Sequence, residues 1–268
     1  MPESQWSQPL TGLMNGWNKV EILDVLRSGT VEVEGLLPWS SNYTFLVRIC
    51  ADGVELPAVY KPKKGERPLW DFPRGTLSGR EYAAFLVSDA LGWDLVPPTV
   101  LRGAEHGLGS IQLFIEHDPN QHYFTFEGQP DFRRALQQLV LFDVVINNAD
   151  RKGGHVIIEM LEQDRDESDI IEQNRLWGID HGISFHHEYK LRTVIWEFAG
   201  KAIPRPLIAD LAQLRSVVEH TDSDLHQELR LLLDREEIAA FNRRINRVIE
   251  GKIFPNPGPG RHYPWPPV

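Results

Sequence analysis

The spacing of apolar residues changes along this chain, and the change limits the folds that are available to it. Apolar and polar residues alternate over three short runs near the beginning, 31–36, 43–51 and 56–61. Alternation with a period of two is typical of half-buried strands. Asp52 and Gly53 separate the second run from the third, and Asp-Gly between two such runs indicates a hairpin. The beginning of the chain therefore predicts a small sheet.

Helical and strand-like segments follow on both sides of this hairpin. Helical spacing covers 10–28 and 80–91, and a glycine follows each of these segments as a plausible stop. Two further runs, at 96–100 and 109–116, are typical of strands. We therefore expect a small sheet with one helix inserted after its third strand.

The second half of the chain is expected to be mostly helical. Residues 132–147 carry the long apolar stripe of a core helix, and two or three more helices are predicted between Pro206 and Gly251. Short strands are predicted at 156–160 and 175–179, with an acidic surface excursion between them. A small sheet followed by helices predicts an α+β protein with two lobes.

These patterns divide the chain into three parts. We expect residues 1–116 to form a β-rich lobe and residues 117–254 a helical lobe. Residues 255–268 contain too much proline and glycine for regular structure and are expected to form an extended tail. This tail could bind a partner, but disorder is the favoured interpretation.

Composition and charge disfavour several classes of protein. The net charge of −10, from 38 acidic and 28 basic residues, disfavours non-specific binding to nucleic acid or to an anionic membrane, although a local basic patch is still compatible with it. No apolar run approaches the ~20 residues that cross a bilayer, and the N-terminus has no secretory pattern. We therefore expect a cytoplasmic protein with no nucleic-acid partner and no stable membrane insertion.

Two aspartates stand where predicted core elements end. Asp150 follows the apolar helix, in a loop that contains Gly153 and Gly154, and Asp180 follows an apolar strand shortly before Gly182. Phosphoryl transfer to a hydroxyl needs one carboxylate to orient the nucleophile and another to hold magnesium on the phosphates. Taken singly, a helix-end cap at Asp150 and a turn residue at Asp180 would explain the two aspartates equally well.

A lysine and a glutamate in the first half strengthen the catalytic interpretation. Lys61 is a lone cation at the end of the third predicted strand, and Glu81 opens the helix that follows. Kinases place a strand lysine on the ATP phosphates and hold it with a helix carboxylate. A lysine at a strand end is by itself usually a solvated surface group, so the interpretation depends on the order of Lys61, Glu81, Asp150 and Asp180 together.

The motifs and their order, over roughly residues 35–204, resemble the phosphatidylinositol 3-/4-kinase superfamily. The resemblance is closest to type II phosphatidylinositol 4-kinases and to the bacterial phosphatidylinositol-kinase-like proteins. Residues 60–63, Tyr-Lys-Pro-Lys, are similar to the family motif Phe-Lys-Pro-Lys, residues 148–155 resemble its catalytic loop, and residues 179–185 resemble its metal-binding segment. The resemblance implies a two-lobed protein-kinase-like (atypical kinase) α+β fold and an ATP-dependent phosphotransferase.

The resemblance also implies a role for each candidate residue. Lys61 would bind phosphates, Glu81 would position it, and Asp150 would be the catalytic aspartate. Asp180 and His155 would hold Mg²⁺ or Mn²⁺. The serine-rich phosphate loop would be Ser40, Ser41 and Asn42. The hinge that reads adenine would be Gln112, Leu113, Phe114 and Ile115. ATP is the implied cosubstrate, and the acceptor is a hydroxyl on an unidentified lipid, protein or small molecule.

His155 departs from the family pattern, in which asparagine is the second metal ligand at this position. A neutral imidazole binds divalent ions, but it suits manganese better than magnesium. Metal preference and turnover are therefore both expected to depend on His155.

Two other functions remain compatible with parts of the pattern. An ATP-binding pseudokinase, acting as an interaction or regulatory protein, would keep the nucleotide site without the transfer. A zinc hydrolase is conceivable because four histidines fall near the proposed site, but they lack the His-x-x-x-His and His-Glu-x-x-His spacings of helical zinc sites. These histidines are His155, His181, His186 and His187.

Overall fold

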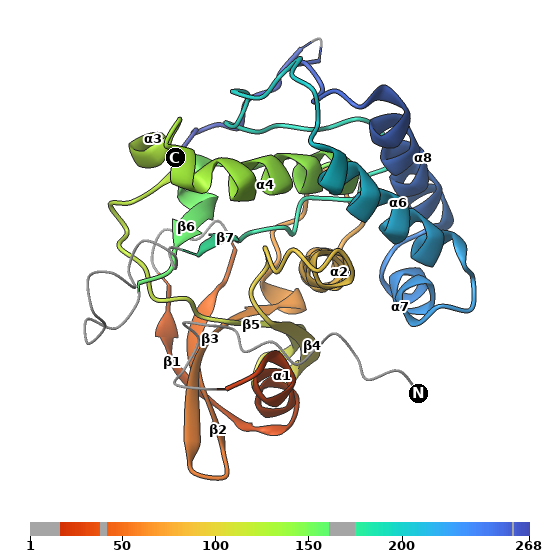
Figure 1. Ribbon diagram of the computed structural model, residues 1–268. Coiled ribbons are helices and arrows are strands. Elements are labelled where there is room, and N and C mark those ends of the chain that lie inside the picture. Colours follow the sequence, from red (N-terminus) through yellow and green to blue (C-terminus); the bar gives the residue numbers. More distant parts are fainter. Residues whose placement is uncertain (1–16, 38–41, 161–174, 259) are drawn as a thin grey trace.

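A computed structural model describes residues 17–37, 42–160, 175–258 and 260–268 (Figure 1). It confirms the predicted α+β fold, with a sheet in the N-terminal part and helices in the C-terminal part. The sheet has five antiparallel strands in the order β1-β2-β3-β5-β4. Its strands are β1 (Thr30–Leu36), β2 (Phe45–Ala51), β3 (Val54–Pro62), β4 (Thr99–Ala104) and β5 (Gly107–Leu113).

The predicted hairpin joins β2 to β3. Asp52 and Gly53 form its turn with φ of 50° and 83°, and Ala51 pairs with Val54. Left-handed backbone at both central residues matches the right-handed twist of the strands, and Asp-Gly adopts it at little cost. Alternate residues of the two strands point into the core, and those fully buried are Val47, Ile49, Leu56, Ala58 and Tyr60.

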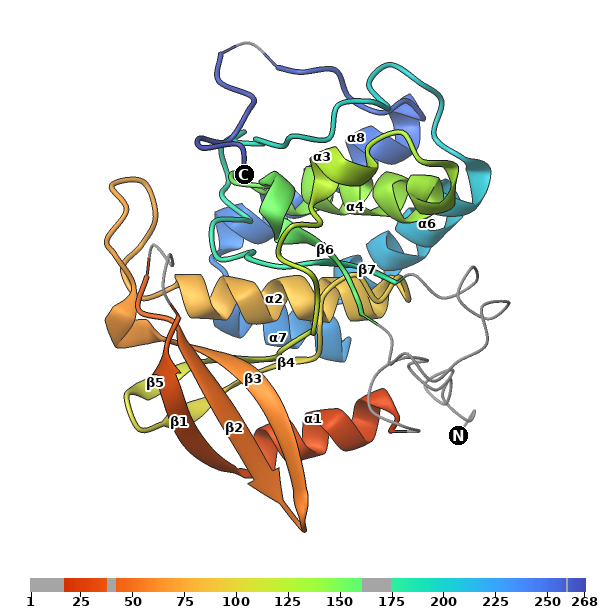
Figure 2. The ribbon, with the colours of Figure 1, turned by 90° about the vertical axis from the view of Figure 1, so that its left-hand side faces the viewer.

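Two helices pack against this sheet. Helix α1 (Lys19–Ser28) begins at Asn18, whose side chain accepts hydrogen bonds from the backbone N–H groups of Val20 and Glu21. Helix α2 (Leu77–Ala90) follows β3 and lies between the sheet and the helical lobe, as Figures 1 and 2 both show. Its position brings residues at the beginning of α2 close to the loops of both lobes.

The C-terminal lobe is built around α4 (Arg133–Ile146) and three later helices, where the sequence predicts two or three. Helix α4 buries its predicted stripe, and α8 packs against both α4 and α6. The remaining elements of this lobe are α3 (Tyr123–Phe126), α6 (Arg205–Glu219), α7 (Asp224–Leu232), α8 (Arg235–Gly251), β6 (Val156–Ile158) and β7 (Leu176–Gly178). Short 3₁₀ turns are η1 (Lys63–Gly65), η2 (Pro130–Phe132) and η3 (Gly153–His155). Strands β6 and β7 pair with each other, and the acidic excursion predicted between them lies outside the described residues.

The C-terminal tail corrects one prediction. The described tail residues have no regular structure, as expected, but the tail lies against the helical lobe and is not disordered. The backbone N–H of Gly153 donates to the carbonyl of Pro267 at 2.7 Å, and that of Thr193 donates to the carbonyl of His262 at 3.1 Å. A high proline content removes backbone donors but keeps every carbonyl as an acceptor, so irregular backbone can still be held in place.

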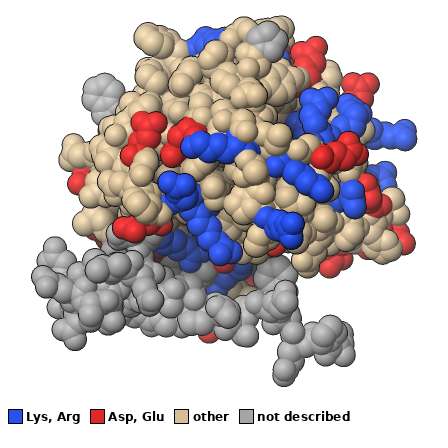
Figure 3. Space-filling model, turned by 45° about the horizontal axis from the view of Figure 1, so that its top comes forward, with Lys and Arg blue, Asp and Glu red and all other residues tan. Residues whose placement is uncertain are grey.

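Charge is distributed unevenly over the surface. Lysine and arginine side chains form a band across the middle of the face seen in Figure 3, although the whole chain is acidic. A negative net charge therefore coexists with a locally basic surface. Among the described residues, none of the helices combines the length and the apolar character that a membrane span requires.

Candidate functional site

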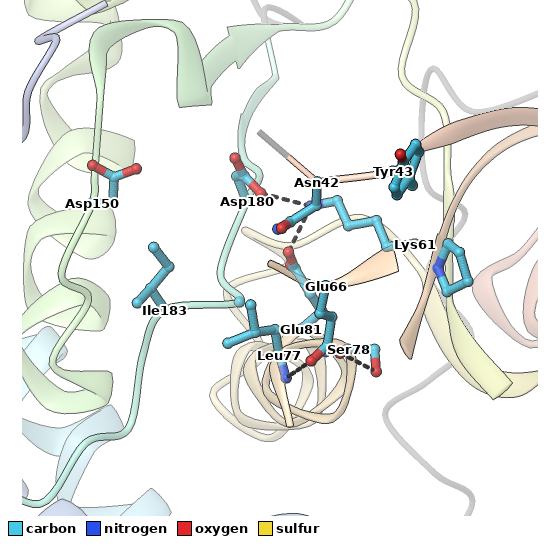
Figure 4. A pocket seen from close by; sticks show the side chains of 12 residues that line it. Asn42, Tyr43, Lys61, Glu66, Leu77, Ser78, Glu81, Asp150, Asp180 and Ile183 are labelled. Atoms are coloured by element: carbon cyan, nitrogen blue, oxygen red, sulfur yellow. Dashed lines mark hydrogen bonds and ion pairs between the residues drawn. The ribbon is translucent and has the colours of Figure 1, made fainter. Parts of the chain in front are cut away.

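A cavity opens where the end of β3, the beginning of α2 and the loops after α4 and β7 meet (Figure 4). It holds about 490 Å³ of space, part of which is open to solvent. Four residues that the sequence placed in one site line it together: Lys61, Glu81, Asp150 and Asp180. Four side chains far apart along the chain thus share a single cavity.

Lys61 makes the two shortest ionic contacts in this cavity. Its Nζ donates to Glu81 Oε1 at 2.6 Å and to Asp180 Oδ1 at 2.7 Å. Burial alone would lower the pKa of Lys61, but the facing carboxylates of Asp180 and Glu81 outweigh it and raise that pKa. The lysine therefore keeps its positive charge at the cavity wall at any physiological pH.

Glu81 connects this lysine to the segment that carries Asp180. The Glu81 side chain is almost fully buried, and its second oxygen accepts a hydrogen bond from the backbone N–H of His181 at 2.8 Å. Gly182 packs against the beginning of α2, where a Cβ would lie 3.4 Å from both Glu81 Oε1 and the Leu77 side chain, a distance typical of ordinary contact. The carboxylate of Glu81 thus positions both a strand residue and the loop after β7.

Asp180 is held in a left-handed backbone conformation with φ of 64°. Aspartate tolerates this conformation better than most residues, and such outliers are common at functional sites. The Lys61 ammonium holds the pKa of Asp180 far below its usual range. Its side chain is 48% exposed, so an ionised carboxylate with access to solvent faces the cavity.

His155 faces the other oxygen of Asp180. Its Nδ1 lies 2.9 Å from the carbonyl of Asp150 and 3.5 Å from the backbone nitrogen of Lys152. We assign the proton to Nδ1 from the shorter contact, because a carbonyl only accepts. Burial lowers the pKa of His155 to about 4, so the ring is neutral and Nε2 keeps its lone pair. Nε2 lies 3.3 Å from Asp180 Oδ2. Two electron-rich atoms thus face each other, an arrangement that a cation between them would stabilise.

These donors fit a hard divalent ion that also binds phosphate and water. In the described residues, no group of three or more His, Cys, Asp or Glu side chains is arranged to hold a metal ion. The zinc hydrolase alternative therefore finds no support in this part of the chain, since a zinc site takes three or four protein ligands. Mg²⁺ in phosphoryl-transfer enzymes takes one or two carboxylates and completes its shell with phosphate oxygens and water.

Asp150 lies across the cavity from the lysine. Helix α4 ends at Asn147, whose φ of 57° turns the chain into the loop, and Asn148 Oδ1 accepts a hydrogen bond from the Asp150 N–H at 3.0 Å. Burial raises the pKa of Asp150 to about 6, while the Lys152 ammonium, 3.6 Å from Asp150 Oδ2, opposes this rise. A carboxylate with this pKa is ionised at neutral pH and still able to accept a proton.

A buried ion pair beneath the loop was not assigned a role from the sequence. Arg151 donates to both carboxylate oxygens of Asp143, each at 2.9 Å, and both side chains are fully buried. Arg151 also donates to the carbonyls of His155 and Ile179. It therefore fixes the Asp150 loop relative to the residue before Asp180. The available signal was an aspartate on a helix stripe that is otherwise apolar.

The predicted phosphate loop and hinge do not all reach the cavity. Ser40 and Ser41 lie outside the described residues, while Asn42 lines the cavity and accepts a hydrogen bond from the Arg67 N–H at 2.8 Å. The hinge residues, which do not line the cavity, are Gln112, Leu113, Phe114 and Ile115. The Gln112 side chain is buried against Thr99. The N–H groups of Leu113 and Phe114 donate to carbonyls of their own lobe. A base at this segment would have to use other backbone groups.

Glu66 is a second residue that the sequence did not single out. Its carboxylate lines the cavity and accepts hydrogen bonds from the backbone N–H of Ser78 at 2.9 Å and from that of Leu77 at 3.2 Å. An anion at a helix N-terminus satisfies donors that have no partner within the helix. Its place in a loop rich in proline and charge carried no pattern that predicts this contact.

Comparisons with known proteins were made in three ways. No family model matches the chain. The protein Rv2133c of Mycobacterium tuberculosis (strain H37Rv) is 35% identical to this chain in an alignment that is 275 positions long. The alignment covers 90% of this chain and 94% of that protein.

The similar solved structures with TM-scores above 0.5 include three different proteins, and two of them are named as kinases. A Golgi casein kinase with Mn/ADP bound has a TM-score of 0.58 at 16% identity, over 87% of this chain and 74% of that one. Hydra Fam20 with sugar has a TM-score of 0.54 at 14% identity, over 86% of this chain and 87% of that one. The Helicobacter pylori proinflammatory kinase CtkA has a TM-score of 0.51 at 8% identity, over 85% of this chain and 93% of that one. At such identities the likeness shows a shared kinase-like fold. None of the three is named as a phosphatidylinositol kinase, so that finer resemblance stays a prediction.

Proposed function

The chain belongs to the family of the Mycobacterium tuberculosis protein Rv2133c, and we propose that it is an ATP-dependent phosphotransferase of the atypical kinase type. It would move the γ-phosphoryl group of ATP to an acceptor hydroxyl. One observation carries this proposal: Lys61 contacts Glu81 at 2.6 Å and Asp180 at 2.7 Å in a cavity that Asp150 also lines. A strand lysine, its helix carboxylate and two loop aspartates are the parts that phosphoryl transfer to a hydroxyl requires.

The residues on the lysine side would bind the nucleotide. Lys61 presents a permanent positive charge for the phosphate oxygens, and Asn42 lies at the same end of the cavity. Asp180 and His155 would hold Mg²⁺ or Mn²⁺, which neutralises phosphate charge during transfer. The presence of His155 supports a preference for manganese over magnesium.

Asp150 would act on the acceptor. Its carboxylate would accept a hydrogen bond from the attacking hydroxyl and take the proton as the new P–O bond forms. The bond between the γ-phosphorus and the β–γ bridging oxygen would break in the same transfer, and ADP would leave. A pKa of about 6 suits this role, since most of the carboxylate is ionised at pH 7. Positioning and charge neutralisation would supply most of the rate, because this reaction needs no covalent intermediate on the protein.

The acceptor class is the open part of the proposal. The resemblance to phosphatidylinositol kinases favours a lipid, whereas a net charge of −10 favours a hydroxyl on a protein or a small polar molecule. The alternative function is an ATP-binding pseudokinase, and the replacement of the family's asparagine by His155 is the observation that favours it.

The test is a screen of the purified chain with labelled ATP and either Mn²⁺ or Mg²⁺. Lipids, proteins and small alcohols serve as acceptors, and ADP and labelled product are measured. We expect product with at least one class of acceptor. Lys61→Met should abolish it, whereas Lys64→Met, which removes an exposed lysine outside the cavity, should not. If ATP raises the melting temperature but neither ADP nor labelled product forms with either metal, the pseudokinase alternative replaces the proposal.

A further inference from the structure

A second cavity lies directly beside the candidate site, under the loop between β3 and α2. It holds about 410 Å³ of space, part of which is open to solvent, and it shares Glu66 and Leu77 with the first cavity. Three basic residues contribute to its wall: Lys63, Arg67 and Arg74. Figure 2 shows this loop standing out beside the beginning of α2. None of these three residues lines the first cavity.

The loop that forms this cavity is fixed at several points. The Glu66 carboxylate binds the backbone N–H of Ser78 at 2.9 Å. Asp71 pairs with Lys190 at 2.9 Å. Phe72 is buried, and the Arg80 guanidinium lies 4.9 Å from the centre of its ring. The walls of the cavity are therefore set by interactions that do not involve its three basic side chains.

In the described part of the chain, the three basic side chains have no acidic partner. No ion pair within 4.0 Å among these residues involves Lys63, Arg67 or Arg74. Both acids of the loop, Glu66 and Asp71, already have partners elsewhere. Like charges that converge on one hollow repel each other, and a bound anion would relieve the repulsion.

We propose that this second cavity binds a phosphomonoester group carried by the phosphoryl acceptor. This inference rests on the proposed function, since it names the chemical class of that acceptor. A phosphomonoester carries nearly two negative charges at pH 7 and three strong acceptor oxygens. Three cations and the Glu66 carboxylate give the cavity wall a net charge of +2, which matches it. Arginine binds such groups through two parallel N–H donors. The shared wall at Glu66 and Leu77 would place an acceptor anchored here next to the cavity that Asp150 lines.

Two sources share this chemistry, a soluble phosphorylated molecule and the headgroup of a phosphorylated lipid. Binding is therefore measured by calorimetry with glycerol 3-phosphate, with glycerol as the unphosphorylated control. Vesicles of phosphatidylcholine, with and without phosphatidic acid, test the lipid source by cosedimentation. Each measurement is repeated with a non-hydrolysable ATP analogue and Mn²⁺ present, so that the nucleotide site is filled.

The variant Arg67→Gln/Arg74→Gln tests the cavity, and Lys64→Gln is its matched control. Lys64 lies in the same turn as Lys63 but does not line the cavity. We expect the double variant to weaken binding of the phosphorylated probe at least ten-fold, with or without the ATP analogue, and Lys64→Gln to change it less than two-fold. Arg74→Gln alone should weaken binding several-fold and serves if the double variant melts early.

Equal binding by the double variant and by Lys64→Gln, or loss of phosphate binding whenever the ATP analogue is present, would overturn this inference. The experiments distinguish a failure of this inference from a failure of the proposed function. Transfer from ATP without binding that depends on Arg67 and Arg74 would refute the second site alone. Binding that depends on these arginines, in a protein that transfers no phosphoryl group, would keep the anion site and refute both the proposed function and the acceptor role.

Discussion

The buried ion pair between Asp143 and Arg151 can be broken one residue at a time. Both side chains are fully buried, and Arg151 makes two charged hydrogen bonds to Asp143, each 2.9 Å long. Arg151→Met would leave the carboxylate of Asp143 buried without its counter-charge. Removing one partner of a buried pair lowers the free energy of unfolding by about 3–5 kcal/mol, and we expect this loss for Arg151→Met and for Asp143→Leu.

The double variant Asp143→Leu/Arg151→Met should lose less free energy of unfolding than either single variant. It removes both charges, so the remaining cost comes from the neutral groups that lose a partner: the Ile179 carbonyl, His181 Nε2 and the side-chain amide of Asn148. The His155 carbonyl still accepts from the Ile179 N–H. Buried acceptors left without a donor cost about 1–3 kcal/mol. Urea denaturation of the four proteins gives the free energies, and Arg134→Met, at an exposed position of α4, is the control that should change stability by less than about 0.5 kcal/mol.

This reasoning would be refuted if the double variant lost as much free energy of unfolding as the two single variants together. A loss below about 1 kcal/mol in each single variant would also refute it. All three variants should also lose phosphoryl transfer, because Arg151 fixes the Asp150 loop relative to Ile179. A double variant that is stable but inactive would separate the positioning role of Arg151 from its contribution to stability.

Two further predictions concern the residues around the proposed metal. The rate of transfer should fall as the pH drops through about 6, where Asp150 takes up a proton. Lys152→Ala should raise the pKa of Asp150 and so move the acid limb of the kcat/KM profile to higher pH. An acid limb at the wild-type pH would show that Asp150 is not the group that titrates. His155→Asn replaces an imidazole nitrogen with an amide oxygen and should raise the ratio of the rate with Mg²⁺ to the rate with Mn²⁺, and an unchanged ratio would place His155 outside the metal site.

Local chemistry explains which elements could be predicted from the sequence. The Asp52-Gly53 turn and the stripe of α4 are encoded within a few residues of each other, so both predictions are confirmed. Helix α1 begins at Lys19, where Asn18 caps it, and residues 10–16 of the predicted helical segment lie outside the described residues. The tail prediction was wrong because composition reports the absence of regular structure but not the distant backbone N–H groups that donate to the tail carbonyls and hold the tail in place.

The candidate site was only partly readable from the sequence. The spacing and order of motifs suggested Lys61, Glu81, Asp150 and Asp180, which the structure brings to one cavity. The contact between Glu66 and the beginning of α2 depends on how the intervening loop folds back, which no local pattern encodes. The proposed hinge shows the same limit, since the partners of its backbone donors lie at distant positions of the lobe.

The most direct measurement is phosphoryl transfer by Asp150→Asn compared with the wild-type chain. This variant keeps the size of the side chain and removes the carboxylate that would accept the proton. With Mn²⁺ and labelled ATP, transfer should fall by at least ~100-fold, while the affinity for ATP stays within a few-fold, and the exposed variant Asp131→Asn should behave as wild type. Transfer by Asp150→Asn at the wild-type rate would contradict the proposed site.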